Sequence, residues 1–283
     1  MVTSASIRAR LKNISRENHI PFQLLIYRYL HERLFFRVSI SSYRNNLILK
    51  GGNLLFANQG LLSRPTRDVD YLAVNVSNDI DEIKLIFTHL CSISYSDDKV
   101  TFDSKSIEIE TISEHDKYSG LRVFMIAKFD TIRQKIQIDI GYGDIVIPIA
   151  KLIDYPVLLD DMETPVIKAY SNETVIAEKF QAMIELSELN SRMKDFYDIY
   201  SILISKKYDS EILKEAVITT FKQRDTNYIE DHSVFTEAFV LDENRNLMWN
   251  TFLKKINESS KLEFTEVMTT IKTILKPIWE GIE

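Results

Sequence analysis

Residues 47–76 read LILKGGNLLFANQGLLSRPTRDVDYLAVNV, and the order of features in this stretch decides the fold. The short apolar run before the diglycine Gly51-Gly52 predicts a strand, and a short helix is expected directly after it. A second strand is expected to begin at Asp68. Successive side chains on a strand point to opposite faces, so Asp68 and Asp70 should lie on the same face. The stretch therefore predicts a sheet that carries paired carboxylates shortly after a glycine turn.

Paired carboxylates on one face of a strand can ligate one or two magnesium ions. Phosphoryl-group chemistry uses such metals to neutralise a triphosphate and to stabilise the attacking and leaving oxygens. The diglycine adds backbone N–H groups that can approach a phosphate closely, although it is equally consistent with a tight turn. The pair alone is not specific, because the chain has a second one, Asp79-Ile-Asp81, at an expected helix start where acids favour the helix dipole.

A third carboxylate is predicted in the segment Ile136-Gln-Ile-Asp139-Ile. Its isoleucines share one face of an expected strand, which leaves Gln137 and Asp139 on the other face. The alternative is an exposed aspartate without a role, but aspartate is depleted in strand interiors, which favours a special role. We therefore predict that Asp139 completes a magnesium site with Asp68 and Asp70.

The remaining pattern predicts helices before this stretch, strands after it, and helices again towards the C-terminus. Helices are expected over 4–18, 21–38 and 79–91, β-rich segments near 106–112, 121–128 and 132–140, and further helices over 173–188, 193–204, 210–224, 232–240, 245–257 and 262–276. The residues Phe129-Asp-Thr131 predict a hairpin between the last two strands. We predict an α/β (α+β) fold, with a mixed sheet domain and its N-terminal helices over 1–165 and a helical domain over 166–283.

Charged residues in the helical part form a second group of candidates. Lys179 ends the segment ETVIAEK on an otherwise apolar helix. A lysine there can hold triphosphate as a point charge, or it can be a surface lysine whose stem covers apolar neighbours. Asp195 and Asp198 are three residues apart and share a helix face. They can position Lys179, a base or an accepting hydroxyl, or they can form an ion-pair cluster with Arg192 and Lys194.

Composition restricts the class of protein. Of 283 residues, 45% are hydrophobic and 27% are charged, as in a soluble globular protein. A single cysteine, Cys91, excludes an internal disulfide framework and a cysteine-rich zinc site. The sequence shows neither a signal peptide nor a membrane-spanning run, so we expect a cytoplasmic protein without a membrane partner.

Charge is distributed unevenly along the chain. The net charge is −6, yet residues 1–50 hold nine Lys and Arg side chains against only two acids, Glu17 and Glu32. A basic segment of this kind is a candidate for contact with RNA. The alternative is a solvated helix face that contains arginines.

The order of the motifs resembles known enzymes. A diglycine followed by two carboxylates on the next strand is similar to the first motif of the polymerase-β-like nucleotidyltransferase superfamily. Asn53 stands where that motif commonly has serine, so a hydroxyl contact to phosphate is absent. More specifically, the chain resembles the AbiEii/AbiGii toxin family of nucleotidyltransferases. Six ordered segments over roughly residues 5–225 carry this resemblance: Phe22-Gln-Leu-Leu, Leu49-Lys-Gly-Gly, Arg64-Pro-Thr-Arg-Asp-Val-Asp70, Ile138-Asp-Ile-Gly-Tyr-Gly-Asp144, Glu173-Thr-Val-Ile-Ala-Glu-Lys179 and Asn190-Ser-Arg-Met-Lys-Asp-Phe-Tyr-Asp198.

The resemblance implies a nucleotidyltransferase-like sheet domain followed by a helical domain, acting as the toxin of a toxin–antitoxin or abortive phage-infection system. It implies metal binding by Asp68 and Asp70, nucleotide contacts by Lys179 and a catalytic role for Asp195. The implied partners are an NTP, an RNA and a cognate antitoxin encoded nearby. Related toxins resemble enzymes that add nucleotides to the acceptor end of tRNA, which blocks aminoacylation and therefore translation.

On this interpretation, an RNA hydroxyl at a tRNA 3′ end attacks the α-phosphorus of the NTP and releases pyrophosphate. Asp195 or Asp139 would position or deprotonate that hydroxyl. The predicted substrate-binding residues lie in the glycine turn, in the loop before the paired aspartates, or on the helical-domain helices: Gly51, Gly52, Asn53, Arg64, Arg67, Lys179 and Asp198. Two alternatives remain, a metal-dependent RNase toxin that needs no NTP, and a degenerate nucleotidyltransferase that only binds RNA or protein.

Overall fold

The computed structural model describes residues 2–114, 118–258 and 261–282. The chain divides into two compact units: unit 1 is Met1–Asp144 with Ala150–Ala169, and unit 2 is Ile145–Ile149 with Tyr170–Glu283. The main change of unit falls after Ala169, and the predicted division into 1–165 and 166–283 stays a prediction. The short passage of Ile145–Ile149 into unit 2 has no counterpart in the prediction, because so short a segment shows no periodicity.

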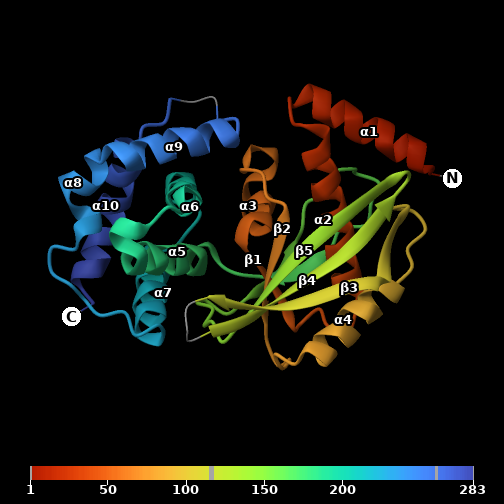
Figure 1. Cartoon of the computed structure of the whole chain (residues 1–283), viewed down its shortest axis with the longest axis horizontal. Helices are drawn as coiled ribbons and strands as arrows, with labels where there is room; N and C mark the ends of the chain where they lie inside the picture. The colour runs from red at the N-terminus through yellow and green to blue at the C-terminus, as the bar shows by residue number, and fades with distance from the viewer. Residues whose placement is uncertain (1, 115–117, 259–260, 283) are drawn as a thin grey trace. The chain divides into compact units, whose positions relative to one another are not determined.

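Unit 1 is built on a mixed sheet (Figure 1). Within the described residues, the sheet has seven strands in the order β3-β4-β5-β2-β1-β7-β6. The strands are β1 (Leu47–Lys50), β2 (Asp68–Ala73), β3 (Val100–Glu114), β4 (Tyr118–Phe129), β5 (Ile132–Tyr142), β6 (Lys151–Asp154) and β7 (Val166–Ala169). The pairs β2–β5 and β1–β7 are parallel, and the other neighbouring strands are antiparallel. The predicted fold class is thereby confirmed.

The predicted hairpin between β4 and β5 is also confirmed. Phe129 pairs with Ile132, and in the two-residue turn between them Asp130 has a φ of +53°. Aspartate is one of the few residues that adopt this left-handed conformation readily. The strands β6 and β7 were not predicted, because four residues each are too few for an alternating pattern to show.

Helix α2 (Phe22–Ile40) covers one face of the sheet (Figure 1). Phe35 of this helix packs edge-on against Tyr71 of β2, with the ring centroids 6.2 Å apart. Because side chains alternate along a strand, Asp68 and Asp70 must then lie on the opposite face of β2. The other α-helices of unit 1 are α1 (Ser4–Glu17), α3 (Gly51–Gln59) and α4 (Ile80–Ser92).

The basic excess of the first fifty residues is partly neutralised inside unit 1. Arg8 Nη1 lies 3.0 Å from a carboxylate oxygen of Asp130, and Arg10 Nη2 lies 2.6 Å from one of Asp161. Three further basic side chains are buried on α2: Arg28, Arg33 and Arg37. Lys12 and Arg16 of α1 are exposed, as expected for a solvated helix face that contains arginines, and RNA contact by this segment stays a prediction.

Glu32 on α2 is a buried carboxyl that accepts a hydrogen bond from the Leu158 backbone N–H at 2.7 Å and lies 2.6 Å from Arg33 Nη2. Burial raises the pKa of Glu32 to about 7. Between the ordinary carboxyl pKa and pH 7 the folded protein thus keeps a proton that the unfolded chain releases. The free energy of unfolding should therefore fall as pH rises through this window, by up to about 3 kcal/mol from this group.

Denaturant unfolding at pH 5 and pH 7.5 checks this prediction, with wild type compared with Glu32→Gln. The amide can still accept from Leu158 but does not titrate, so the variant should gain stability relative to wild type as pH rises. Glu108→Gln, which changes an exposed carboxylate paired with Lys135 at 2.8 Å, is the matched control and should follow wild type at both pH values. If the free energy of unfolding of Glu32→Gln changes between the two pH values as it does in wild type, the raised pKa of Glu32 is contradicted.

Unit 2 is helical, as predicted for the C-terminal part of the chain. Its α-helices are α5 (Asn172–Leu186), α6 (Met193–Ser205), α7 (Ser210–Gln223), α8 (Glu237–Leu241), α9 (Glu243–Lys255) and α10 (Phe264–Glu280). Phe196 of α6 stacks edge-on against Phe264 of α10 at 5.3 Å between centroids, and Trp249 of α9 packs on the same ring at 5.5 Å. None of the helices in the described part of the chain combines the length and apolar character needed to cross a bilayer.

Candidate active site

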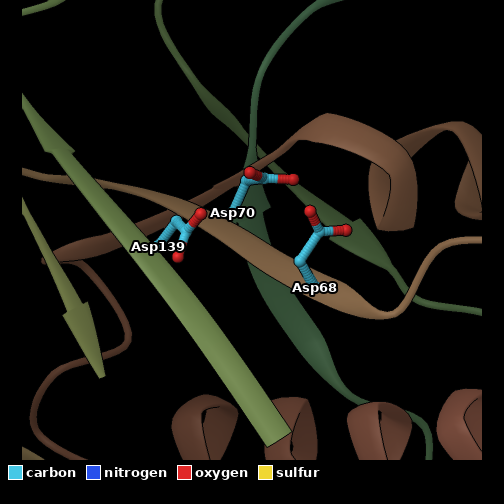
Figure 2. Close-up of side chains that lie close together, drawn as sticks. All are labelled: Asp68, Asp70 and Asp139. Atoms are coloured by element: carbon cyan, nitrogen blue, oxygen red, sulfur yellow. The ribbon is translucent and has the colours of Figure 1, made fainter. Parts of the chain in front are cut away.

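Three carboxylates converge on one face of the sheet in unit 1. Asp68 and Asp70 project from β2, and Asp139 projects from the neighbouring β5, where it is the register partner of Asp70 (Figure 2). One oxygen from each carboxylate can be chosen so that all three lie within 4.8 Å of one another. The alternate residues of both strands, such as Val69 and Ile138, are fully buried on the other face, and this burial fixes the orientation of the acids.

The glycine turn lies directly against this carboxylate group. Gly51 has a φ of +67°, and a Cβ atom on it would lie only 1.9 Å from Asp70 Oδ2 and 2.8 Å from Asp70 Cβ. A Cβ on Gly52 would lie 2.7 Å from Thr66 Cβ. Both positions therefore require glycine. Gly51 needs it for its backbone conformation and for its close approach to Asp70 on β2, and Gly52 needs it for its close approach to Thr66 in the loop before β2.

Asn53 connects helix α3 to the start of β2. Its Nδ2 donates to the Asp68 carbonyl at 2.7 Å, and its Oδ1 lies 3.2 Å from Nδ1 of the fully buried His31. Burial lowers the pKa of His31 to about 4, so the imidazole is neutral and the network assigns its proton to Nδ1, which donates to Asn53. Thr66 Oγ1 donates to Asp68 Oδ1 at 2.5 Å. Sequence reasoning did not identify His31 and Thr66, which hold Asp68 in place.

Two basic side chains flank the acids across four adjacent strands. In the register of the sheet, Arg122 on β4 is opposite Asp139, Asp139 is opposite Asp70, and Asp70 is opposite Lys50 on β1. Lys50 Nζ lies 2.7 Å from Asp144 Oδ2. The row therefore reads base, acid, acid, base. Sequence reasoning did not assign a role to either base.

Arg122 forms a two-pronged ion pair with Asp139. Its Nε and Nη2 atoms donate to Asp139 Oδ1 and Oδ2, both at 2.8 Å. This pairing raises the pKa of Arg122 above its ordinary value, so the side chain remains a cation. Gln137 Nε2 adds contacts of 3.1 and 3.2 Å to the same carboxylate.

The loop before β2 carries Arg64 and Arg67, the predicted phosphate ligands. Arg64 is half-buried, whereas Arg67 is exposed, with its guanidinium 5.9 Å from the centroid of the Tyr27 ring. Both arginines belong to unit 1 and lie within four residues of Asp68 in the chain. Their predicted contact with phosphate stays a prediction.

The predicted residues of unit 2 form a cluster of their own within that unit. Lys179 Nζ on α5 lies 2.6 Å from Asp195 Oδ1 and 2.9 Å from Asp198 Oδ2, both on α6. Arg192 Nε lies 2.7 Å from the second oxygen of Asp195. Both carboxylates are buried and the lysine is 14% exposed, so Lys179 is not a solvated surface lysine. Of the ion-pair cluster considered with Arg192 and Lys194, the Arg192 pair is present, and in the described ion pairs the second cation is Lys179. A nucleotide contact by Lys179 stays a prediction.

The carboxylate group of unit 1 has the chemistry of a divalent-metal site. Its donors are all hard oxygens, which suit Mg²⁺, Mn²⁺ or Ca²⁺ rather than a thiolate- or imidazole-binding metal. Asp68, Asp70 and Asp139 are half-buried, so an ion from solvent can reach them. Such a site next to glycine backbone N–H groups can bind a polyphosphate.

Comparisons with known proteins agree with this chemistry. A family model described as the nucleotidyl transferase AbiEii toxin of a type IV toxin–antitoxin system matches residues 33–270. A proposed nucleotidyltransferase from H. pylori has a similar crystal structure, with a TM-score of 0.54 and 14% identity over 92% of this chain and 96% of that chain. JHP933 from Helicobacter pylori gives a TM-score of 0.53 and 14% identity over 92% and 93%. At this identity the two structures show the fold alone. Comparison with curated protein sequences gives no significant match.

Proposed function

Because the chain belongs to the AbiEii family of nucleotidyltransferase toxins of type IV toxin–antitoxin systems, we propose that it transfers a nucleoside monophosphate from an NTP to the 3′ end of tRNA. The family supports a nucleotidyltransferase, an NTP substrate and an antitoxin partner. The tRNA acceptor and the resulting block of translation are the proposed refinement. The observation that carries the proposal is the convergence of three carboxylates beside a glycine turn at the start of α3.

Asp68, Asp70 and Asp139 are the proposed ligands of Mg²⁺, which when bound supplies positive charge to the triphosphate and to the leaving pyrophosphate. The backbone N–H groups at the start of α3 bind phosphate oxygens, since a helix N-terminus favours anions. Gly51 and Gly52 permit that approach because neither has a side chain in the way. Asn53 acts indirectly in this scheme, because its amide holds the backbone of β2.

The cluster of Lys179, Asp195 and Asp198 in unit 2 is proposed to serve the same transfer. Lys179 is the proposed nucleotide-binding cation. Asp195 is the carboxylate that we propose positions or deprotonates the accepting hydroxyl. Their buried ion pairs favour a functional or structural requirement, since removal of one partner leaves an uncompensated buried charge. We further propose that the protein acts in the cytoplasm, where NTPs and tRNA are available, and that a cognate antitoxin counteracts it.

Incubation of the purified chain with Mg²⁺, total tRNA and each labelled NTP in turn tests the proposal, with the RNA resolved on a denaturing gel. Label from one NTP should enter tRNA and should be absent with Asp70→Ala and greatly reduced with Lys179→Met. Shortened RNA that needs no NTP would instead identify a metal-dependent nuclease. Binding of RNA without label or cleavage would identify a degenerate transferase. Either of these two results would overturn the proposed reaction.

A further inference from the structure

Arg122 lies next to the proposed metal site and is paired with one of its ligands, Asp139. A metal ion would compete with Arg122 for Asp139, and a phosphate would compete with Asp139 for Arg122. Its two-pronged pair with Asp139 uses both carboxylate oxygens of the third acid, at 2.8 Å each. Planar guanidinium donors match a phosphate group as well as they match a carboxylate. Asp139 therefore has two alternative counter-charges, Arg122 and a metal, and Arg122 has two alternative anions, Asp139 and a phosphate.

We propose that Arg122 is a positioning residue that holds Asp139 until a phosphate group of the nucleotide takes over its guanidinium, so that nucleotide binding and metal binding are coupled. The proposal rests on the proposed function of this face of the sheet. Without nucleotide, the site offers a metal mainly Asp68 and Asp70. When Arg122 contacts phosphate, Asp139 becomes available as the third ligand.

The surroundings of the pair allow this exchange. The side chains of Arg122 and Asp139 are 31% and 19% exposed, so the ion pair is not locked in the core and an anion from solvent can reach the guanidinium. Asp139 retains the two Gln137 contacts after Arg122 leaves, and its backbone is fixed between β2 and β4. The carboxylate would thus keep its place on the face that carries Asp70.

Two binding measurements without any transfer reaction test the coupling. Mn²⁺ binding, followed by the EPR signal of the free ion, should be about tenfold or more tighter in Arg122→Met than in wild type, because a competing cation has been removed. The double variant Arg122→Met with Asp139→Asn should lose that gain. Binding of inorganic pyrophosphate without metal is measured by calorimetry. Compared with wild type, it should be about tenfold weaker in Arg122→Met. It should be tighter in Asp139→Asn, because that change releases the guanidinium of Arg122 from its ion pair.

Lys128→Met is the matched control. It removes a basic residue of the same strand, paired with Asp103 at 2.8 Å, and should change neither affinity. Unchanged or weaker Mn²⁺ binding in a folded Arg122→Met variant would overturn the proposal. It would also be overturned if this variant bound pyrophosphate as tightly as wild type. Absence of Mn²⁺ binding by every variant would also overturn it. If the two affinities shift as expected but no NTP label enters RNA, only the proposed transfer reaction fails.

Discussion

Replacement of Asp70 by Asn should reduce nucleotide transfer by about a thousandfold or more, and Asp68→Asn should do the same. Each change removes a negative charge from the proposed metal site, and stabilisation of triphosphate charge by a metal contributes several kcal/mol to such reactions. The amide has almost the volume of the carboxylate, so the packing of the buried face of β2, which carries Val69 and Tyr71, should persist. Steady-state rates under saturating Mg²⁺ measure the effect, and circular dichroism checks the fold.

The chain supplies its own control for this prediction. Asp79-Ile-Asp81 has the same spacing, but Asp79 caps helix α4 by accepting from two backbone N–H groups, and Asp81 is exposed in the first turn. Asp81→Asn should therefore leave transfer within about twofold of wild type, since surface substitutions away from a site have small effects. Equal rates for Asp70→Asn and wild type would reject the carboxylate site.

Replacement of Gly51 by Ala should both destabilise the protein and reduce transfer by about a hundredfold. The positive φ of +67° costs a residue with a Cβ about 1–2 kcal/mol. The new methyl group would also overlap Asp70, and not only at its mobile Oδ2 atom, because the Cβ of Asp70 would lie 2.8 Å away. Strand β2 or helix α3 must then shift, which misplaces a proposed metal ligand.

Gly60→Ala separates these two effects. Gly60 has a φ of +63°, but a Cβ there would meet no atom within 4 Å. This variant should show a comparable loss of thermal stability while keeping near wild-type kcat/KM. If both alanine variants keep their activity, close contact between the glycine turn and Asp70 is not required for transfer.

The strand face on which each acid lies was predictable from alternation alone. The isoleucines of β5 and the apolar residues of β2 read as one buried face, which places Asp68, Asp70 and Asp139 on the other. That the strands are neighbours was not predictable, because their contact depends on the order of seven strands among the described residues. The family resemblance is confirmed by the model match, whereas the roles of the individual site residues stay predictions.

Arg122 was only partly within reach of the sequence. The predicted hairpin places Phe129, Asp130 and Thr131 between the strands, and counting outward from that loop brings Arg122 opposite Ile138. In the structure Phe129 pairs with Ile132, and this shift by one residue brings Arg122 opposite Asp139. His31 and Asp144 were not within reach in the same way. The contact of His31 with Asn53 joins two helices, and the position of Asp144 depends on a segment after β5 that has no periodic pattern. Only tertiary packing places such residues.

The parallel pairing of β2 with β5 makes the acid group insensitive to the length of chain between its members. A helix and two long strands separate Asp70 from Asp139 in the chain. Their closeness nevertheless depends only on which residues of β2 and β5 are register partners. Insertions into the intervening loops should therefore be neutral for the site. A one-residue insertion within β5 would turn Asp139 into the core, and a two-residue insertion would restore its face but move it about 7 Å along the strand. An odd number of residues inserted within a strand changes the face of the acid, and an even number changes its register. These two properties, rather than loop length, thus determine which variants of this enzyme can keep a complete set of proposed metal ligands.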